Sequence, residues 1–257
     1  MKVTILGSGT CVPSLQRSSC SVLVETNDSK LVLDCGVGTM HRLLQAKITI
    51  DEVTHMFFSH FHPDHTAEFV PFLFASKYPK SARRTTPLHV VAGKGVKRFY
   101  ENLKHVFGEW IDLGVGLLDL IELDITSGDI RCFSDITVQS MPVRHRKESL
   151  AFRITGPEGT SVVYSGDTDV CQGLVRIAKD ADLFICESAM PDGKKVDGHL
   201  TPSLAGEIAT RANVKKLVLT HLYPACDKVD IEKQCRKTYR GPLVVARDLL
   251  VFVLNRP

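Results

Sequence analysis

Ser59-His60-Phe61-His62-Pro63-Asp64-His65 is the stretch that decides the fold, because three imidazoles and a carboxylate lie within six residues. The apolar run 53–58 precedes it and is typical of a buried strand, so we expect the stretch on the loop after that strand. In extended chain His60 and His62 point the same way, whereas Asp64 and His65 are offset and can face a second centre about 3.5–4 Å away. A solvated histidine-rich turn, or histidines that cap the next helix, would account for one imidazole. The H-x-H-x-D-H spacing favours a metal site.

Three further residues are candidates to complete this site, because a hydrolytic dinuclear centre needs more ligands than one loop supplies. His145 follows the alternating apolar run 136–141. His221 follows the run 217–220, and Asp167 lies in a Gly-Asp turn after another such run. Each residue alone has an ordinary explanation as an exposed strand end or a common turn. Their joint occurrence favours a shared site.

These segments together resemble the metallo-β-lactamase-fold hydrolases, and within them the ribonuclease Z branch. The histidine stretch is typical of the superfamily, and Ser-Gly-Asp-Thr at 165–168 with Gly-His-Leu-Thr at 198–201 narrows the resemblance to the branch. The matching segments run nearly end to end: 5–10, 33–36, 60–65, 143–145, 164–168, 185–189, 198–201 and 219–221. The resemblance implies an α+β fold, a four-layer αββα sandwich.

The resemblance also implies two divalent metal ions that share a bridging hydroxide, held by seven side chains. The ligands would be His60, His62 and His145 for one ion, Asp64, His65 and His221 for the other, and Asp167 for both. Imidazole and carboxylate ligands suit zinc, with manganese or iron as alternatives. Asp64 is in addition a candidate catalytic residue. Asp34 matches a position that supports the site from behind, with a simple turn carboxylate as the alternative.

His199 is separate from these ligands and is the candidate catalytic acid. It precedes Thr201 and Pro202, which are typical of a helix start, so an exposed loop histidine is the alternative. By the resemblance, His199 would protonate the leaving oxygen or steady the phosphoryl group. Glu187 occupies the position of a carboxylate that would orient His199.

The expected substrate is a small anion. Arg144 and Arg146 flank His145, and cations beside a metal site favour an anionic substrate, although a charged turn would give the same pattern. Ribonuclease Z enzymes carry a long arm that grips transfer RNA, inserted in the bacterial type between the motifs found here at His145 and Asp167. Little more than two strands and the turn 156–159 separate these motifs here. A phosphodiesterase on small or cyclic phosphodiesters is therefore favoured over transfer-RNA 3′ processing.

Two other functions stay open. A thioester or lactone hydrolase would use the same ligands. A metal-binding protein without catalytic activity is the non-hydrolytic alternative.

Composition is that of an ordinary globular chain. The 257 residues are 44% hydrophobic and 24% charged with a net charge of +3, too mild to indicate broad nucleic-acid binding. No linker or repeat divides the chain, so one domain is expected over 1–257. The eight cysteines show no C-x-x-C spacing, and no leader or membrane span is recognised, which favours a cytoplasmic protein with no membrane partner. A homodimer is left open.

Periodicity predicts strands that are interrupted by helices along the chain. Strands are expected near 2–6, 20–26, 30–34, 53–58, 130–133, 136–141, 149–155, 160–165, 182–186, 216–220 and 248–254. Helices are expected near 37–46, 66–76, 96–107, 170–179, 203–211 and 230–237. The segment 108–129 is expected to be irregular.

Overall fold

The computed structural model describes residues 1–255, whose strands form two seven-stranded sheets. The first sheet has the order β14-β1-β2-β3-β4-β5-β6. Its strands are β1 (Lys2–Gly7), β2 (Ser21–Glu25), β3 (Lys30–Leu33), β4 (His55–Phe58), β5 (Leu88–Gly93), β6 (Leu118–Leu123) and β14 (Leu250–Val253). The second sheet has the order β13-β12-β11-β10-β9-β8-β7. Its strands are β7 (Asp129–Phe133), β8 (Ile136–Pro142), β9 (Leu150–Thr155), β10 (Ser161–Tyr164), β11 (Leu183–Glu187), β12 (Leu217–Thr220) and β13 (Leu243–Val245).

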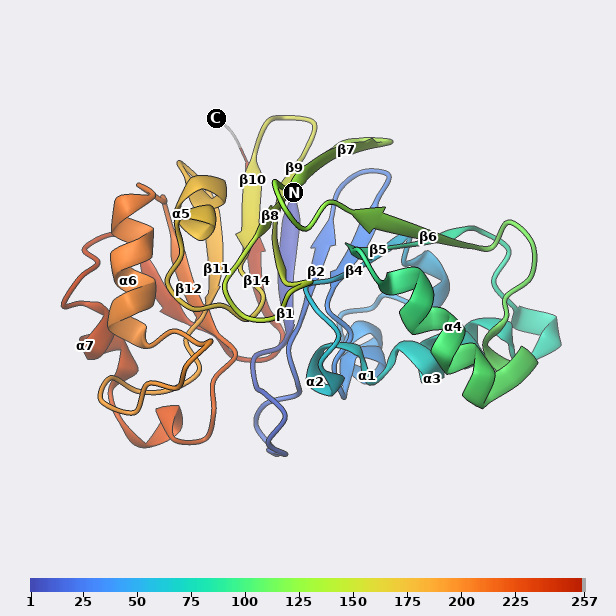
Figure 1. Cartoon of the computed structure of the whole chain (residues 1–257), viewed down its shortest axis with the longest axis horizontal. Coiled ribbons are helices and arrows are strands. Elements are labelled where there is room, and N and C mark those ends of the chain that lie inside the picture. Colours follow the sequence, from blue (N-terminus) through green and yellow to red (C-terminus); the bar gives the residue numbers. More distant parts are fainter. Residues whose placement is uncertain (256–257) are drawn as a thin grey trace.

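Helices cover the outer face of each sheet. The α-helices are α1 (Thr39–Gln45), α2 (Pro63–Thr66), α3 (Phe69–Lys77), α4 (Val96–Phe107), α5 (Gln172–Ala178), α6 (Pro202–Arg211) and α7 (Ile231–Cys235). Short 3-10 helices are η1 (Ile50–Glu52), η2 (Lys80–Ala82), η3 (Gly108–Ile111) and η4 (Cys226–Lys228). Figure 1 shows α1 to α4 on the side of the first sheet and α5 to α7 on the side of the second. None of the helices in the described chain is long and apolar enough to cross a bilayer.

The buried side chains form three layers, as a four-layer sandwich requires. The middle layer lies between the sheets and takes residues from both, such as Phe57 and Phe152. Phe58, the neighbour of Phe57 on β4, belongs to the layer under α3 and α4, because successive strand residues point to opposite faces. Val163 on β10 belongs to the layer under α5 and α6. The predicted α+β, αββα architecture is confirmed.

Three strands were not predicted from the sequence, and two expectations were wrong. The segment 108–129 is not irregular, because it contains η3 and then β6, which pairs in parallel with β5. Neither β5 nor β6 was expected, nor was the three-residue β13. The helix expected over 66–76 begins later, as α3, and the second half of the stretch 60–65, which was expected in a loop, lies in the separate short helix α2.

Strand direction gathers the candidate residues at one edge of the sandwich. Strands β3 to β6 are parallel to one another, and so are β10 to β13. Ligand sites in such sheets lie beyond the carboxyl ends of the strands. Asp34 follows β3, the stretch 60–65 follows β4, Asp167 follows β10 and His221 follows β12. Between His145 and Asp167 the chain forms β9 and β10, joined by a tight turn.

Candidate metal centre

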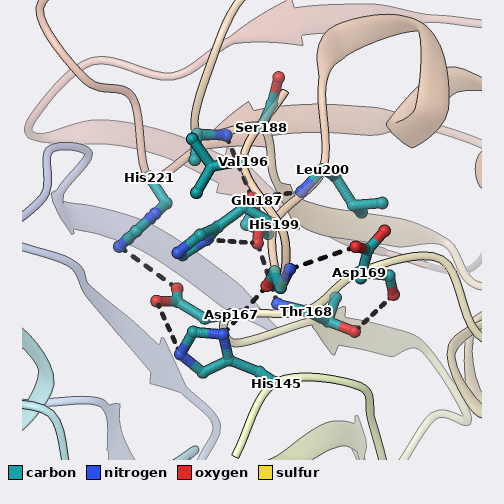
Figure 2. Close-up of polar contacts among 12 residues, drawn as sticks. His145, Asp167, Thr168, Asp169, Glu187, Ser188, Val196, His199, Leu200 and His221 are labelled. Carbon is teal, nitrogen blue, oxygen red and sulfur yellow. Dashed lines mark hydrogen bonds and ion pairs between the residues drawn. The ribbon is translucent and has the colours of Figure 1, made fainter. Parts of the chain in front are cut away.

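Asp167 lies between two groups of side chains that come from both sheets. Figure 2 shows its carboxylate between His145 and His221. Its Oδ2 is 3.7 Å from Nε2 of His60 and 3.9 Å from Nε2 of His145. Its Oδ1 is 3.3 Å from Nε2 of His65 and 3.2 Å from Nε2 of His221. The two oxygens therefore face different groups, which is the arrangement expected of a bridging carboxylate.

Each group brings its ligand atoms to within 4.8 Å of one another. The first group is His60, His62, His145 and Asp167, and the second is Asp64, His65 and His221. In the first, Nδ1 of His62 is 3.3 Å from Nε2 of His145. In the second, Oδ2 of Asp64 is 3.5 Å from Nε2 of His221. The structure thus brings together all seven residues that the sequence suggested as ligands.

The donor set fits divalent cations, as the state of its buried atoms shows. The Nε2 atoms of His60, His65 and His221 and the Oδ1 atom of Asp167 are buried without a hydrogen-bond partner among the described residues. Buried polar atoms are nearly always paired, so four such atoms that converge need a common explanation. A cation with nitrogen and oxygen ligands would satisfy them together.

Hydrogen bonds on the far side of three rings direct their Nε2 atoms inward. Nδ1 of His65 lies 2.6 Å from Oδ2 of Asp34, and Nδ1 of His60 lies 3.0 Å from Oγ of Ser59. Nδ1 of His145 lies 3.0 Å from the carbonyl oxygen of Gly198. A carboxylate or carbonyl accepts from Nδ1–H, which leaves the lone pair on Nε2 for a metal.

Asp34 is fully buried and lies behind the ring of His65. Its backbone is in the left-handed region at φ 58°, which turns the carboxylate toward the loop after β4. Its Oδ1 accepts from the backbone N–H of Ser59, and its Oδ2 accepts from Ser59 Oγ and from the Tyr164 hydroxyl, each at 2.7 Å. Ser59 and Tyr164 were missed, because a strand-end serine and an apolar-run tyrosine have no distinctive pattern.

The electrostatics favour the metal-binding protonation state at three of the ligands. Burial, followed by the nearby charge of His65, lowers the pKa of His60 well below its usual value, and burial also lowers the pKa of His145. Burial opposes ionisation of Asp167, but the charges of His221 and His65 outweigh it and hold its pKa well below the usual range. At His65 burial opposes the imidazolium, but the charges of Asp167 and Asp34 outweigh it and raise the pKa. Metals bind neutral imidazole and ionised carboxylate, so the states of His60, His145 and Asp167 suit a cation, which would have to displace the proton of His65.

His199 and Glu187 form a dyad beside this centre. Nδ1 of His199 is 2.9 Å from Oε1 of Glu187 (Figure 2). The buried Glu187 also accepts from the backbone N–H groups of Thr168, Ala189 and Leu200 at 2.9–3.1 Å, which fixes its carboxylate. Burial opposes the imidazolium, but the hydrogen bond and charge of Glu187 outweigh it and raise the pKa of His199. The His199 side chain is 14% exposed, so it reaches the site's surface.

The two arginines do not join this cluster. The Arg144 guanidinium lies 3.3 Å from Oδ1 of Asp197, and both side chains are more than half exposed. Arg146 is exposed too, and its charge contributes to lowering the pKa of His62 after burial, so it lies on the same side as the first group. The structure thus places both arginines at the rim of the centre.

A family-level comparison matches residues 1–234 to the family described as Anti-Pycsar protein Apyc1. The chain belongs to this family. An uncharacterized protein of Mycobacterium leprae is 33% identical, over 95% of this chain and 85% of its own length. A Myxococcus xanthus protein named Ribonuclease Z is 27% identical over 96% of both chains.

Solved structures show the same fold. The metallo-β-lactamase fold protein YhfI from Bacillus subtilis aligns with a TM-score of 0.84 and 22% identity, over 98% of this chain and 99% of its own. The short form of human tRNase Z aligns with a TM-score of 0.81 and 22% identity over the whole of both chains. A diphosphatase from the PhnP family aligns at 0.74 and 17%, over 99% of this chain and 98% of its own. The predicted superfamily, its ribonuclease Z-like branch and the class of metal-dependent hydrolase are confirmed.

Proposed function

We propose that this hydrolase cleaves a small or cyclic phosphodiester. One observation carries the proposal: Asp167 faces two groups of ligand atoms through its two oxygens, and the His199–Glu187 dyad lies directly beside it. Two cations about 3.5–4 Å apart with an adjacent acid are the usual equipment for in-line displacement at phosphorus.

The residues that would hold the ions form two sets, which follow the two groups of neighbouring ligand atoms. His60, His62 and His145 would hold one ion, and Asp64, His65 and His221 the other, with Asp167 shared. When bound, two divalent ions supply Lewis acidity that activates water and neutralises charge on the phosphoryl group. Zinc suits this mixed set of nitrogen and oxygen ligands best, with manganese or iron as alternatives.

The remaining chemistry belongs to the chain's own residues. His199 would donate a proton from Nε2 to the leaving oxygen, because its Nδ1 is occupied by Glu187. Glu187 would keep the ring oriented and stabilise its charge. Asp64 would act both as a metal ligand and as a catalytic residue. Its side chain is 11% exposed. Arg144 and Arg146, at the rim, would attract the anionic substrate.

The compact connection between His145 and Asp167 supports a substrate smaller than transfer RNA. β9 and β10 with their tight turn fill it. The similarity to a diphosphatase of the PhnP family is consistent with small phosphorylated substrates. Relatives named Ribonuclease Z favour RNA 3′ processing as the second candidate.

A turnover panel tests the proposal. Protein of known metal content is assayed with bis(p-nitrophenyl) phosphate, cyclic nucleotides, a lactone, a thioester and a precursor transfer RNA. We expect turnover of small or cyclic phosphodiesters. Efficient cleavage of the transfer-RNA precursor without turnover of small diesters would establish the second candidate. Activity on the lactone or thioester alone, or on nothing despite bound metal, would replace the proposal with one of the two remaining functions.

Two properties of the whole molecule stay predictions. A cytoplasmic location agrees with the eight cysteines, all of them free thiols. A homodimer is to be tested by light scattering.

A further inference from the structure

The Tyr164 hydroxyl contacts Asp34, the carboxylate behind the metal centre, from the opposite sheet. Tyr164 is the last residue of β10, in the second sheet, and its side chain is buried in the layer between the sheets. Its hydroxyl donates to Oδ2 of Asp34 at 2.7 Å, and Asp34 follows β3 in the first sheet. The Cys20 thiol lies 3.1 Å from the same hydroxyl.

Oδ2 of Asp34 is the point where several contacts meet. It accepts from Ser59 Oγ at 2.7 Å and faces Nδ1 of His65 at 2.6 Å in addition to Tyr164. Ser59 follows β4 directly, and His65 lies in the short helix α2 that comes next. In the described chain, the side chains of Ser59 and His65 bond to this carboxylate from the first sheet's half of the molecule. The side chain of Tyr164 bonds to it from the second sheet.

The position of Tyr164 along its strand gives this contact its importance. Asp167 follows Tyr164 by three residues, so the same strand end carries both the hydroxyl on Asp34 and the carboxylate that faces both groups. Asp34 in turn holds His65, whose Nε2 is 3.3 Å from Oδ1 of Asp167. Tyr164, Asp34, His65 and Asp167 therefore close a loop of contacts that spans the two sheets. The hydrogen bond from Tyr164 to Asp34 thereby links the end of β10 to the carboxylate that holds His65.

We propose that Tyr164 is a positioning residue of the metal centre, which through Asp34 sets His65 against Asp167. The inference rests on the metal ligands of the proposed function, but it does not depend on the substrate. The ion held by Asp64, His65 and His221 should depend on Tyr164 more than the ion held by His60, His62 and His145. Asp34 contacts His65 directly, whereas it reaches His60 only through Ser59.

Metal affinity measures this directly. Metal-free wild-type protein and Tyr164→Phe are titrated with zinc against a chromophoric chelator, and the two binding steps are resolved. Partners of metal-bound histidines are worth about 10–100-fold in affinity. We expect about a tenfold loss in one step, near the low end of that range because Tyr164 acts through Asp34, with the other step unchanged. Asp34→Asn should weaken the same step at least as much.

The matched control is Tyr239→Phe. The Tyr239 hydroxyl is also buried and donates to the carbonyl of Val214 at 3.1 Å, with no contact to the centre. Tyr239→Phe should lower the free energy of unfolding of the metal-free protein in urea about as much as Tyr164→Phe does. It should leave both zinc-binding steps unchanged. Cys20→Ala, which keeps the bond between Tyr164 and Asp34, should also leave them unchanged.

Three results would overturn the inference. Two zinc steps in Tyr164→Phe that match wild type would remove the role of the hydroxyl. An equal weakening of both steps, shared by Tyr239→Phe, would make the effect one of general stability. If Tyr164→Phe does not fold, unchanged zinc steps in Asp34→Asn would refute the relay. A wild-type protein that binds two zinc ions but hydrolyses no phosphodiester would end the proposed function and leave this inference standing.

Discussion

Removal of His199 should separate the chemical step from metal binding. Its ring lies against Glu187, and its ligand atom lies within 4.8 Å of those of Asp167 and His221. The two groups that would hold the ions do not include His199. We therefore expect His199→Ala to keep the fold and both metal ions. Turnover should fall, because the leaving oxygen loses the proton that His199 would donate.

The size of the loss follows from how well the dyad is held. Loss of a positioned acid costs about 10²–10⁴-fold. Three backbone N–H groups fix Glu187, and Glu187 fixes His199 at 2.9 Å, so we expect a value near the middle, about 10³-fold. At 1.36 kcal/mol for each tenfold change, this is about 4 kcal/mol of transition-state stabilisation.

The assay compares two leaving groups. An alkyl phosphodiester needs protonation as the bond breaks, whereas p-nitrophenolate departs readily without it. His199→Ala should therefore lose about 10³-fold on the alkyl ester and much less on the aryl ester. Equal losses on both would refute the general-acid role and indicate phosphoryl positioning. Loss of a metal ion on elemental analysis would make His199 a ligand.

Further measurements test the rest of the site and the fold. Asp167→Ala should bind neither ion tightly, and a wild-type protein that takes up no transition metal in zinc or manganese would contradict the ligand assignment. Arg144→Ala and Arg146→Ala should each raise KM for an anionic substrate and leave kcat nearly unchanged, whereas an unchanged KM would make both residues ordinary rim charges. Burial, then the charge of His89, lowers the pKa of His55 to about 4, so the unfolded chain binds more protons between pH 4 and 6.5 and stability falls as the pH falls through this window. His55→Gln should flatten that slope in the metal-free protein, by at most about 3 kcal/mol, and an unchanged slope would show that His55 keeps its ordinary pKa. A single domain over the whole chain predicts one unfolding transition by circular dichroism and fluorescence, and two separated transitions would indicate two domains.

The candidate ligands could be found from sequence because their signal is local. Four of them lie within the six residues 60–65, and each of the others comes shortly after an apolar run. Strand ends of parallel sheets meet at one edge, so the pattern along the chain carries over to proximity in space. The αββα order itself came from the resemblance, since periodicity does not say which sheet a strand joins.

The missed features depend on contacts between distant parts of the chain. Each residue of β6 pairs with β5, about 30 residues earlier, and this pairing decides the strand in a segment with weak periodicity. Tyr164 reads as an ordinary core residue of a strand. The Tyr164 hydroxyl becomes part of the centre because the fold brings it into contact with Asp34, 130 residues away in sequence.

The division of the ligands between the two sheets also sets the order of events during synthesis. The stretch 60–65 emerges from the ribosome long before His221, and β14, which pairs with β1, emerges later still. A nascent chain that has exposed only β1 to β6 lacks His145, Asp167 and His221. Metal capture should therefore follow translation of nearly the entire sequence, and truncated products should be released without metal.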